Sequence, residues 1–406
     1  MTLAQRRARL GVRHHLAART TTVEEAVDGV VALHATDPAS VYLSSWSRVH
    51  AISVADVEEA LYSRRTLLRL LGMRRTVFVT DVATAAQVQA ACSYDIAARQ
   101  RRLLEKQLGT LGHPDNVPNP ADWLDEVLAS VEKALRARGS ATAQQLADDE
   151  PRLRQQLLMA KGKPYESIGN VTSRVLFQLA AEGHIVRGRP RGSWQSTQYY
   201  WSLLTDWLAE GAAGAGPDDN PGRSTAADWP ALSEDEARTA LARRWLYAFG
   251  PAPVADLRWW TGWNAGQTKK ALAAIGPAEV DLDGEPAIAL PDDLAPVPAP
   301  DPWIALLPAL DPTAMGWQSR DWYVGPHRAA LFDRSGNIGP TVWSDGRIVG
   351  AWSHRPTGEI AVRLLEDVGA EKTAAVEAEA ARLSEWLGEA RVTPKFRTPA
   401  EKELSG

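Results

Sequence analysis

The spacing of apolar positions is most regular between residues 140 and 203. The segment SATAQQLADD predicts a helix that begins at Ser140 or Thr142, and the apolar residues of VTSRVLFQLAA recur at helical spacing until EGH ends that helix at a glycine. A strand IVRG, a turn rich in Gly, Pro and Arg, and a returning strand STQYYW follow. Helix, turn, helix and a basic two-stranded hairpin in this order predict a winged helix.

The same order of elements returns twice more along the chain. After residue 231, a helix ending near Gly250, a short helix ADLRWW and a helix from Asn264 precede the strands AEVDL and PAIAL, which flank the turn DGE. In the first 85 residues, the predicted helices LAQRRARLGVRHHLA, TVEEAVDGVVALHA and VADVEEALYSRRTLLRL lead into a strand RRTVFVT. We therefore predict three related winged-helix units.

From residue 303 the pattern changes to alternating strands. The predicted strands lie in WIALLPALD, RAALFD, GPTVWSDGRIVGAWSH and EIAVRLLED, and a helix over about 371–390 follows them. The turn SDGR between two alternating apolar runs is the strongest hairpin signal in the chain. These segments predict a small antiparallel β unit.

Two segments without periodicity divide the chain. GAAGAGPDDNPGRSTAADWP has the composition of a linker, and the prolines of PDDLAPVPAPDP exclude a helix interior or a central strand. The predicted fold class is α+β, with three tandem winged-helix units and a C-terminal antiparallel β unit. Its predicted parts are a first unit at 1–110, a central unit at 111–210, a linker at 211–230, a third unit at 231–300, and the β unit with its helix at 301–406. Since a Gly/Pro/Asp segment carries few buried contacts, we expect a chain cut within 211–230 to give two soluble parts.

Composition indicates an ordinary globular protein. Of its 406 residues, 45% are hydrophobic, no apolar run approaches the roughly 20 residues of a membrane span, and the arginine-containing N-terminus lacks the apolar stretch of a signal peptide. We expect a cytoplasmic protein without a membrane partner. Cys92 is the single cysteine, which excludes an intramolecular disulfide and a cysteine-rich metal site. We expect no metal and no cofactor.

The charge is unevenly distributed. Residues 1–203 contain 26 Lys and Arg against 20 Asp and Glu, and the remaining residues contain 19 against 30, within a net charge of -5. Such asymmetry is typical of a protein that presents one face to a polyanion, although ordinary surface variation produces it too.

Four stretches together resemble a known family. The stretches are VVALHATDPASVYLSSWSRV, LLRLLGMRRTVFVT, YAFGPAPVADLRWWTG and LLPALDPTAMGWQSRDWYVG, the last followed by GPTVWSDGRIVGAW. In their order along the chain, they are similar to the tandem winged-helix DNA glycosylases of the AlkZ and YcaQ type. The resemblance spans most of the chain. It implies a C-shaped DNA-binding architecture and the excision of alkylated bases, with a Gln-aliphatic-Gln or Gln-aliphatic-Asp triplet serving the catalytic water.

The chain departs from this family at the triplet. His34 stands where the resemblance implies the first glutamine, Ala35 fills the aliphatic place, and Thr36 takes the third, with Asp37 one residue further on. Either a different polar set performs the reaction, or the protein keeps the DNA-binding shell and has lost or changed the chemistry.

These residues have the chemistry that excision needs. A purine alkylated at N7 or N3 is already cationic and leaves as a neutral base, so the enzyme supplies a positioned water and stabilisation of an oxocarbenium-like sugar. Asp37 can offset that positive charge and accept a proton from water, His34 can orient the water or the carboxylate, and Thr36 can add a hydrogen bond. The equally open structural interpretation is that Asp37 caps the segment starting at Pro38 and that His34 is a satisfied polar residue.

Basic residues fall on the elements by which winged helices contact DNA. Arg187, Arg189 and Arg191 occupy alternating positions of the wing, and Trp194 beside them is a base-stacking candidate. The other predicted DNA contacts lie at the third helix of the central unit and before the strand TVFVT: Lys161, Lys163, Arg174, Arg74 and Arg75. For the polar pair in LDPTAMGWQSRDW, Asp311 and Arg320, we predict a structural ion pair.

The sequence thus favours a DNA repair glycosylase, monofunctional and monomeric, that acts on double-stranded DNA. Bulky natural-product adducts or crosslinks are conceivable substrates. The alternative is a non-catalytic DNA-binding protein such as a transcription regulator, which usually dimerises and places one reading helix per protomer. Three winged units in one chain favour a monomer that encloses DNA. A nucleoside-binding enzyme is disfavoured because no glycine-rich phosphate loop follows a strand.

Overall fold

Helices surround a three-stranded antiparallel sheet in the first part of the chain. The computed structural model describes residues 1–406 except 110–116, 160–161, 163–165, 214–228 and 230–231. The helices here are α1 (Leu3–Arg13), α2 (Val23–Asp28), α3 (Pro38–Arg48), α4 (Val54–Glu58), α5 (Val82–Val88) and α6 (Tyr94–Gly109), with π-helical turns at Glu59–Ser63 and Gln89–Ser93. The strands are β1 (Leu33–His34), β2 (Leu67–Gly72) and β3 (Thr76–Asp81), in the order β1-β3-β2.

Two predicted helices of this part are wrong in extent. The predicted second helix ends at Asp28, and Leu33–His34 pairs with β3 instead. The end of the predicted third helix is strand β2, all six residues of which are buried. A short, fully buried apolar run has no polar face from which helix and strand can be distinguished, so pairing with β3 decides the outcome.

The central part consists of helices and two hairpins. Its helices are α7 (Pro120–Arg138), α8 (Ala143–Asp149), α9 (Thr172–Ala181) and α10 (Leu204–Ala213), with a 3-10 turn at Pro151–Arg154. Its strands are β4 (Ala141–Thr142), β5 (Gln156–Met159), β6 (Ser167–Asn170), β7 (Ile185–Pro190) and β8 (Tyr199–Leu203), forming a sheet β4-β8-β7 and a hairpin β5-β6. The predicted start at Thr142 is confirmed, because its hydroxyl and Gln145 form a reciprocal capping box. The β5-β6 hairpin was not predicted.

The third part follows the predicted order closely. It contains α11 (Glu234–Phe249), α12 (Val254–Thr261), α13 (Ala265–Ile275), β9 (Ala278–Leu282) and β10 (Glu285–Ala289). Asn264 caps α13 in a capping box with Gln267, as predicted. Asp283 and Gly284 turn the hairpin with φ of 51° and 93°, the left-handed conformation that a tight type I′ turn requires.

A four-stranded antiparallel sheet forms the last part. Its strands β11 (Ile304–Leu307), β12 (Thr341–Ser344), β13 (Arg347–His354) and β14 (Ile360–Leu364) lie in sequence order, accompanied by α14 (Pro312–Met315), α15 (Asp321–Val324), a 3-10 turn at Gly325–His327, α16 (Arg328–Leu331), α17 (Ala370–Leu387) and α18 (Pro399–Ser405). The SDGR hairpin and the helix after residue 370 are confirmed. The predicted strand RAALFD is wrong, because Arg328–Leu331 is a helical turn.

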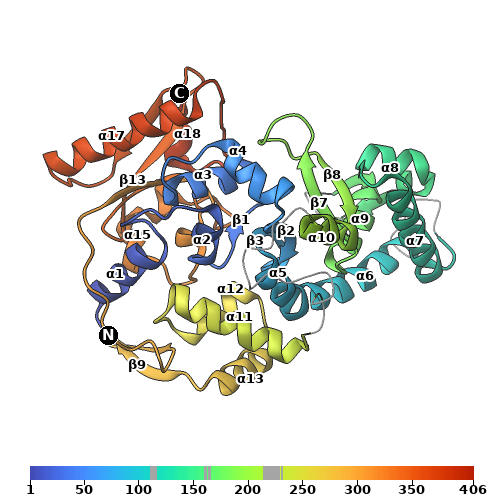
Figure 1. Ribbon diagram of the computed structural model, residues 1–406, viewed down its shortest axis with the longest axis horizontal. Helices are drawn as coiled ribbons and strands as arrows, with labels where there is room; N and C mark the ends of the chain where they lie inside the picture. Colours follow the sequence, from blue (N-terminus) through green and yellow to red (C-terminus); the bar gives the residue numbers. More distant parts are fainter. Residues whose placement is uncertain (110–116, 160–161, 163–165, 214–228, 230–231) are drawn as a thin grey trace.

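Buried apolar side chains form two principal cores. One core is shared by the first, third and last parts and includes residues from Leu10 to Ala400. The other lies mainly in the central part, from Leu104 of α6 to Leu203. The central part is joined to the rest by a small cluster around Leu71, Ile96 and Ala181, and by residues of β7 and α10 that belong to the first core: Val186, Leu204, Trp207 and Leu208. In Figure 1 the central part, with α7, α8 and α9, accordingly lies to one side of the remaining mixed helical and sheet body.

The predicted ion pair between Asp311 and Arg320 is wrong. Asp311 makes a bidentate pair with Arg48 of α3 at 2.7 and 2.8 Å, and both side chains are fully buried. Arg320 instead donates to the carbonyls of Trp317 and Gly336. The buried pair therefore joins α3 to the turn after β11, two segments far apart in sequence.

None of the helices in the described part of the chain is both long and apolar enough to cross a membrane.

Candidate functional site

The HATDP segment connects strand β1 to helix α3. His34 ends β1 opposite Phe78 of β3, and Pro38 is the first residue of α3. Asp37 has extended backbone geometry and is the N-cap, and proline follows it because the first helical N–H needs no partner. The polar residues therefore lie at the start of helix α3. The prediction that a helix ends at His34 and Ala35 is wrong.

The Asp37 carboxylate is held by two backbone amides. Its Oδ1 accepts from Ala39 N at 3.2 Å, and its Oδ2 accepts from Lys395 N at 2.9 Å. The residue is 6% exposed, and burial raises the pKa of the carboxyl although both amide bonds oppose the shift. A cavity of about 10 Å³ borders it, which is space for about one water. Asp37 thus attaches the C-terminal segment to the start of α3.

His34 is neutral, and its Nδ1 accepts from the backbone. Burial lowers the pKa of its imidazole to about 3, and the positive charge of Arg74 adds to this shift. Its Nδ1 lies 3.5 Å from the Thr36 N, which can only donate, so the proton of the neutral ring is assigned to Nε2. The ring lies 5.1 Å from that of Phe78. A ring of this kind can orient water but is a poor proton acceptor.

Thr36 has an unsatisfied hydroxyl. The residue is half-buried, and its Oγ1 is shielded from solvent with no hydrogen-bond partner among the described residues. A buried hydroxyl without a protein partner is unusual and indicates a place for a water or a ligand atom. In sequence, this unpartnered hydroxyl lies between a neutral imidazole at His34 and a carboxylate at Asp37.

Arg74 lies next to His34 on the turn between β2 and β3. Its guanidinium stacks on Trp259 at 3.8 Å from the ring centroid, and Arg320 lies 4.9 Å from the same ring. Burial lowers the pKa of Arg74 to about 10, and the charge of Arg320 contributes. Arg74 and Arg75 have φ of 52° and 65°, a conformation that costs free energy in residues other than glycine.

Arg75 and Arg174 bring the first and central parts together. Arg75 lies 5.2 Å from the ring of Phe177 on α9. Burial lowers the pKa of Arg75, and the nearby charge of Arg174 on the same helix lowers it further. These predicted DNA contacts therefore lie beside Arg74.

The three wing arginines lie in different environments. Arg187 is enclosed between Tyr199 and Trp201, and burial lowers its pKa to about 10. Arg189 pairs with Glu58 and stacks on Tyr62, whereas Arg191 is exposed. A register shift between Arg187 and Pro190 breaks the alternation on which the prediction rested. Two of the three side chains therefore contact the first part of the chain or their own sheet.

Trp194 contacts protein side chains. Its ring lies 4.9 Å from Tyr42 of α3 and 6.2 Å from Trp386 of α17. Stacking on a base would require these contacts to change. Lys161 and Lys163 lie outside the described residues.

Sequence reasoning missed two residues of this site. Trp259 was given no functional role, and Arg320 was assigned to Asp311, yet both lie beside the Arg74 guanidinium. The apolar pattern around Trp259 and the short distance in sequence between Asp311 and Arg320 gave no signal of this. No group of His, Cys, Asp and Glu within the described ranges has an arrangement that could hold a metal ion.

Comparisons with known proteins agree with this arrangement. The profile of the family described as DNA glycosylase AlkZ-like matches residues 27–386, so the chain belongs to that family. An interstrand DNA cross-link repair glycosylase of Streptomyces sahachiroi is 32% identical over 183 residues, which cover 42% of this chain and 49% of the relative. The match therefore spans about half the length of that relative. The solved structure of the Streptomyces sahachiroi DNA glycosylase AlkZ has the same fold, with a TM-score of 0.68, 21% identity, and coverage of 97% of this chain and 98% of the other.

Proposed function

We propose that this protein is a DNA repair glycosylase that excises purines carrying a cationic N7 or N3 substituent from double-stranded DNA. The observation that carries the proposal is the family match over residues 27–386, within which the HATDP segment supplies three polar groups. A neutral imidazole, an unpartnered hydroxyl and a carboxylate occur there within four consecutive residues.

The roles of these groups follow from their environments. The Nε2–H of His34 and the Thr36 hydroxyl hold a water on the face of the sugar opposite the departing base. The Asp37 carboxylate stabilises the oxocarbenium-like sugar and accepts the proton of the water, for which its raised pKa is favourable. The cationic purine departs as a neutral base and needs no acid.

The reaction is proposed to be monofunctional hydrolysis. Water is the nucleophile in this scheme, and no step requires an enzyme amine. Lys395 is the lysine to test, since its charge acts on Asp37. We expect no trapping of a covalent adduct by borohydride. Bulky natural-product adducts and crosslinks are proposed substrates because the Streptomyces sahachiroi relative is named an interstrand cross-link repair glycosylase.

The proposed architecture is three tandem winged-helix units and a β unit that enclose DNA in a C-shaped surface, in a cytoplasmic monomer. The recurrent order of helices followed by a hairpin supports this, with hairpins β2-β3, β7-β8 and β9-β10 as wings. Arg74, Arg75 and Arg174 are the proposed DNA contacts with the most support, since Arg74 lies next to His34 and Arg174 lies near Arg75. Arg187, Arg189, Arg191, Lys161, Lys163 and Trp194 remain further candidates.

A non-catalytic DNA-binding protein is the second candidate. The specific observation in its favour is that both Asp37 oxygens accept backbone N–H groups, as a purely structural cap would. Such a protein would bind duplex DNA without releasing bases.

Incubation of the full chain with duplex DNA containing one N7-methylguanine, followed by detection of abasic sites, tests the proposal. We expect time-dependent abasic sites with the wild type and about 10²-fold less with Asp37→Asn, the range for loss of a general base. Tight binding without abasic sites, repeated with a bulky N7 adduct, would establish the non-catalytic alternative.

A further inference from the structure

A cavity lined by arginines lies next to the candidate site. It has a volume of about 90 Å³ and lies between α6, the β2-β3 turn and the residues that join α12 to α13. Arg74, Arg75 and Arg99 line it, together with Gln100, Thr261 and Gly262. Gly262 permits the close approach of the two turns, because a Cβ there would lie 3.2 Å from Arg74 Cγ. Three arginine residues therefore contribute to the lining of one cavity.

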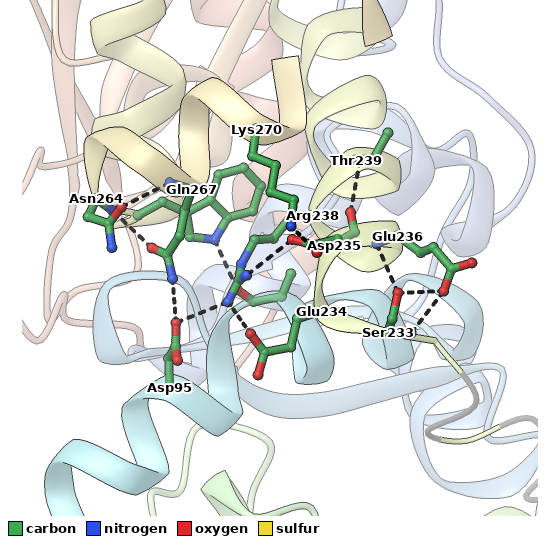
Figure 2. Close-up of polar contacts among 12 residues, drawn as sticks. Asp95, Ser233, Glu234, Asp235, Glu236, Arg238, Thr239, Asn264, Gln267 and Lys270 are labelled. Carbon is green, nitrogen blue, oxygen red and sulfur yellow. Dashed lines mark hydrogen bonds and ion pairs between the residues drawn. The ribbon is translucent and has the colours of Figure 1, made fainter. Parts of the chain in front are cut away.

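The positive charge of this cavity is not neutralised by its lining. Asp95 is the one carboxylate among the described lining residues. Its Oδ2 already accepts from Gln267 Nε2 at 2.7 Å and from Arg238 Nη2 at 3.2 Å. Figure 2 shows Asp95 of α6 directed toward Gln267 of α13 and Arg238 of α11. The carboxylate is thus used to join α6 to the third part of the chain.

Among the described residues, the three arginines have no carboxylate partner of their own. No ion pair is found for Arg74, Arg75 or Arg99 within the part of the chain that the structure describes, and Arg74 Nε is buried without any partner. The guanidinium groups of Arg74 and Arg75 have lowered pKa values, with burial as the main cause. Crowded, partly buried cations without counterions are costly unless an anion joins them.

We propose that this cavity binds a phosphate of the DNA backbone adjacent to the nucleotide that the candidate site acts on. The inference rests on the proposed function for its ligand, and it adds Arg99 to Arg74 and Arg75 as a phosphate-binding residue. Guanidinium groups match the geometry of phosphate oxygens.

The position of Arg74 gives the bound phosphate a second effect. The positive charge of Arg74 lowers the pKa of His34, so the same charge opposes a developing cation on the sugar. A phosphate on Arg74 offsets this charge only when DNA is bound. The cavity therefore couples docking of the backbone to the electrostatics of the reaction.

Binding of a labelled undamaged duplex to the full chain, measured by anisotropy between about 50 and 200 mM salt, tests the subsite. The double variant Arg75→Gln/Arg99→Gln should bind about tenfold more weakly and should reduce the slope of log K against log salt by about 0.9, the loss of one phosphate contact. Arg136→Gln is the matched control, because Arg136 is exposed on α7 in the central part. It should leave affinity and slope unchanged.

Two further arms make the outcome decisive. Sodium sulfate should raise the melting temperature of the wild type above that in sodium chloride of equal ionic strength. The double variant should show a smaller difference while melting cooperatively, because only the general stabilisation by excluded sulfate remains. A double variant with wild-type slope and affinity would overturn the subsite, even if N7-methylguanine is excised. A smaller slope of log K against log salt in the double variant, together with no excision by the wild type, would support the subsite and reject the glycosylase. Stabilisation by sulfate without any change in DNA binding would indicate a free-anion site and would also overturn the proposal.

Discussion

Replacing Asp37 with asparagine separates the proposed catalytic role of this residue from its structural one. The carboxylate accepts two backbone N–H groups, one from Ala39 and one from Lys395. Asparagine has one acceptor oxygen, so its amide group would face one of these donors. Loss of a cap costs about 0.5–2 kcal/mol, and loss of a hydrogen bond to a charged group costs about 1.5–3 kcal/mol. Since only one of the two bonds is lost, we expect a loss of stability of about 1–3 kcal/mol.

The expected effect on excision is larger than the effect on folding. If Asp37 stabilises the sugar cation and accepts a proton, single-turnover base release should fall by about 10² or more, while duplex affinity stays equal or rises because a negative charge is gone. Both quantities are measured on one purified variant, with urea unfolding and a single-lesion duplex, at a temperature where the variant is fully folded. Ser53→Ala is the control, since Ser53 is the N-cap of α4 and matches the loss of a cap without altering the HATDP segment. Excision within a few-fold of wild type in a destabilised Asp37→Asn protein would refute the catalytic role.

Three other predictions concern stability. Burial lowers the pKa of His34 to about 3, so below a pH of about 6.5 the unfolded chain takes up a proton that the folded chain does not. The free energy of unfolding should therefore fall by about 1.4 kcal/mol per pH unit on acidification from there toward about pH 3. His34→Gln should remove this contribution from the pH dependence of unfolding, while the equally buried His14 keeps its own. Arg48→Met should lower the free energy of unfolding in urea by about 3–5 kcal/mol, because the Asp311 carboxylate stays buried without its partner. The further change Asp311→Leu should recover part of this loss, and no recovery would contradict the role given to the pair. Because the main core includes residues on both sides of 211–230, the C-terminal part produced alone should fail to melt cooperatively, and the N-terminal part should keep only the transition of the central core. A mixture of the two parts should recover the melting of the whole chain; two independently folded parts would contradict this and restore the expectation drawn from composition.

Local signals in the sequence predicted local structure well. The caps at Thr142 and Asn264 depend on side chains that bond to backbone within three residues, and the turn at Asp345 and Gly346 depends on the left-handed φ of 48° and 82° at these adjacent residues, so their signals are contained in the sequence itself. The strand at Leu67–Gly72 was predicted as helix because its burial depends on β3 and on the shared core. Tertiary pairing decides such segments, and it leaves no periodic signal.

The candidate site could be predicted only in part for the same reason. HATDP was identified from its chemistry and its place in the chain. The amide of Lys395, which holds Asp37, comes from a segment 358 residues away, and no spacing rule connects the two. The assignment of Arg320 failed because nearness in sequence was taken for nearness in space, while the true partner of Asp311 lies 263 residues before it.

Burial explains how histidine and threonine can stand where the resemblance implies glutamines. A glutamine amide is neutral and both donates and accepts, and it can position a water without adding charge next to a cationic sugar. A protonated histidine would add a positive charge at that place and oppose the reaction. In this chain, burial and the charge of Arg74 lower the pKa of His34 to about 3, so at neutral pH the ring remains an uncharged donor. The Thr36 hydroxyl supplies a group that donates and accepts, and it has no partner in the described protein. The replacement is therefore chemically compatible with the proposed reaction because of the environment of His34, and a change that let water reach the ring would raise its pKa and slow excision at acidic pH.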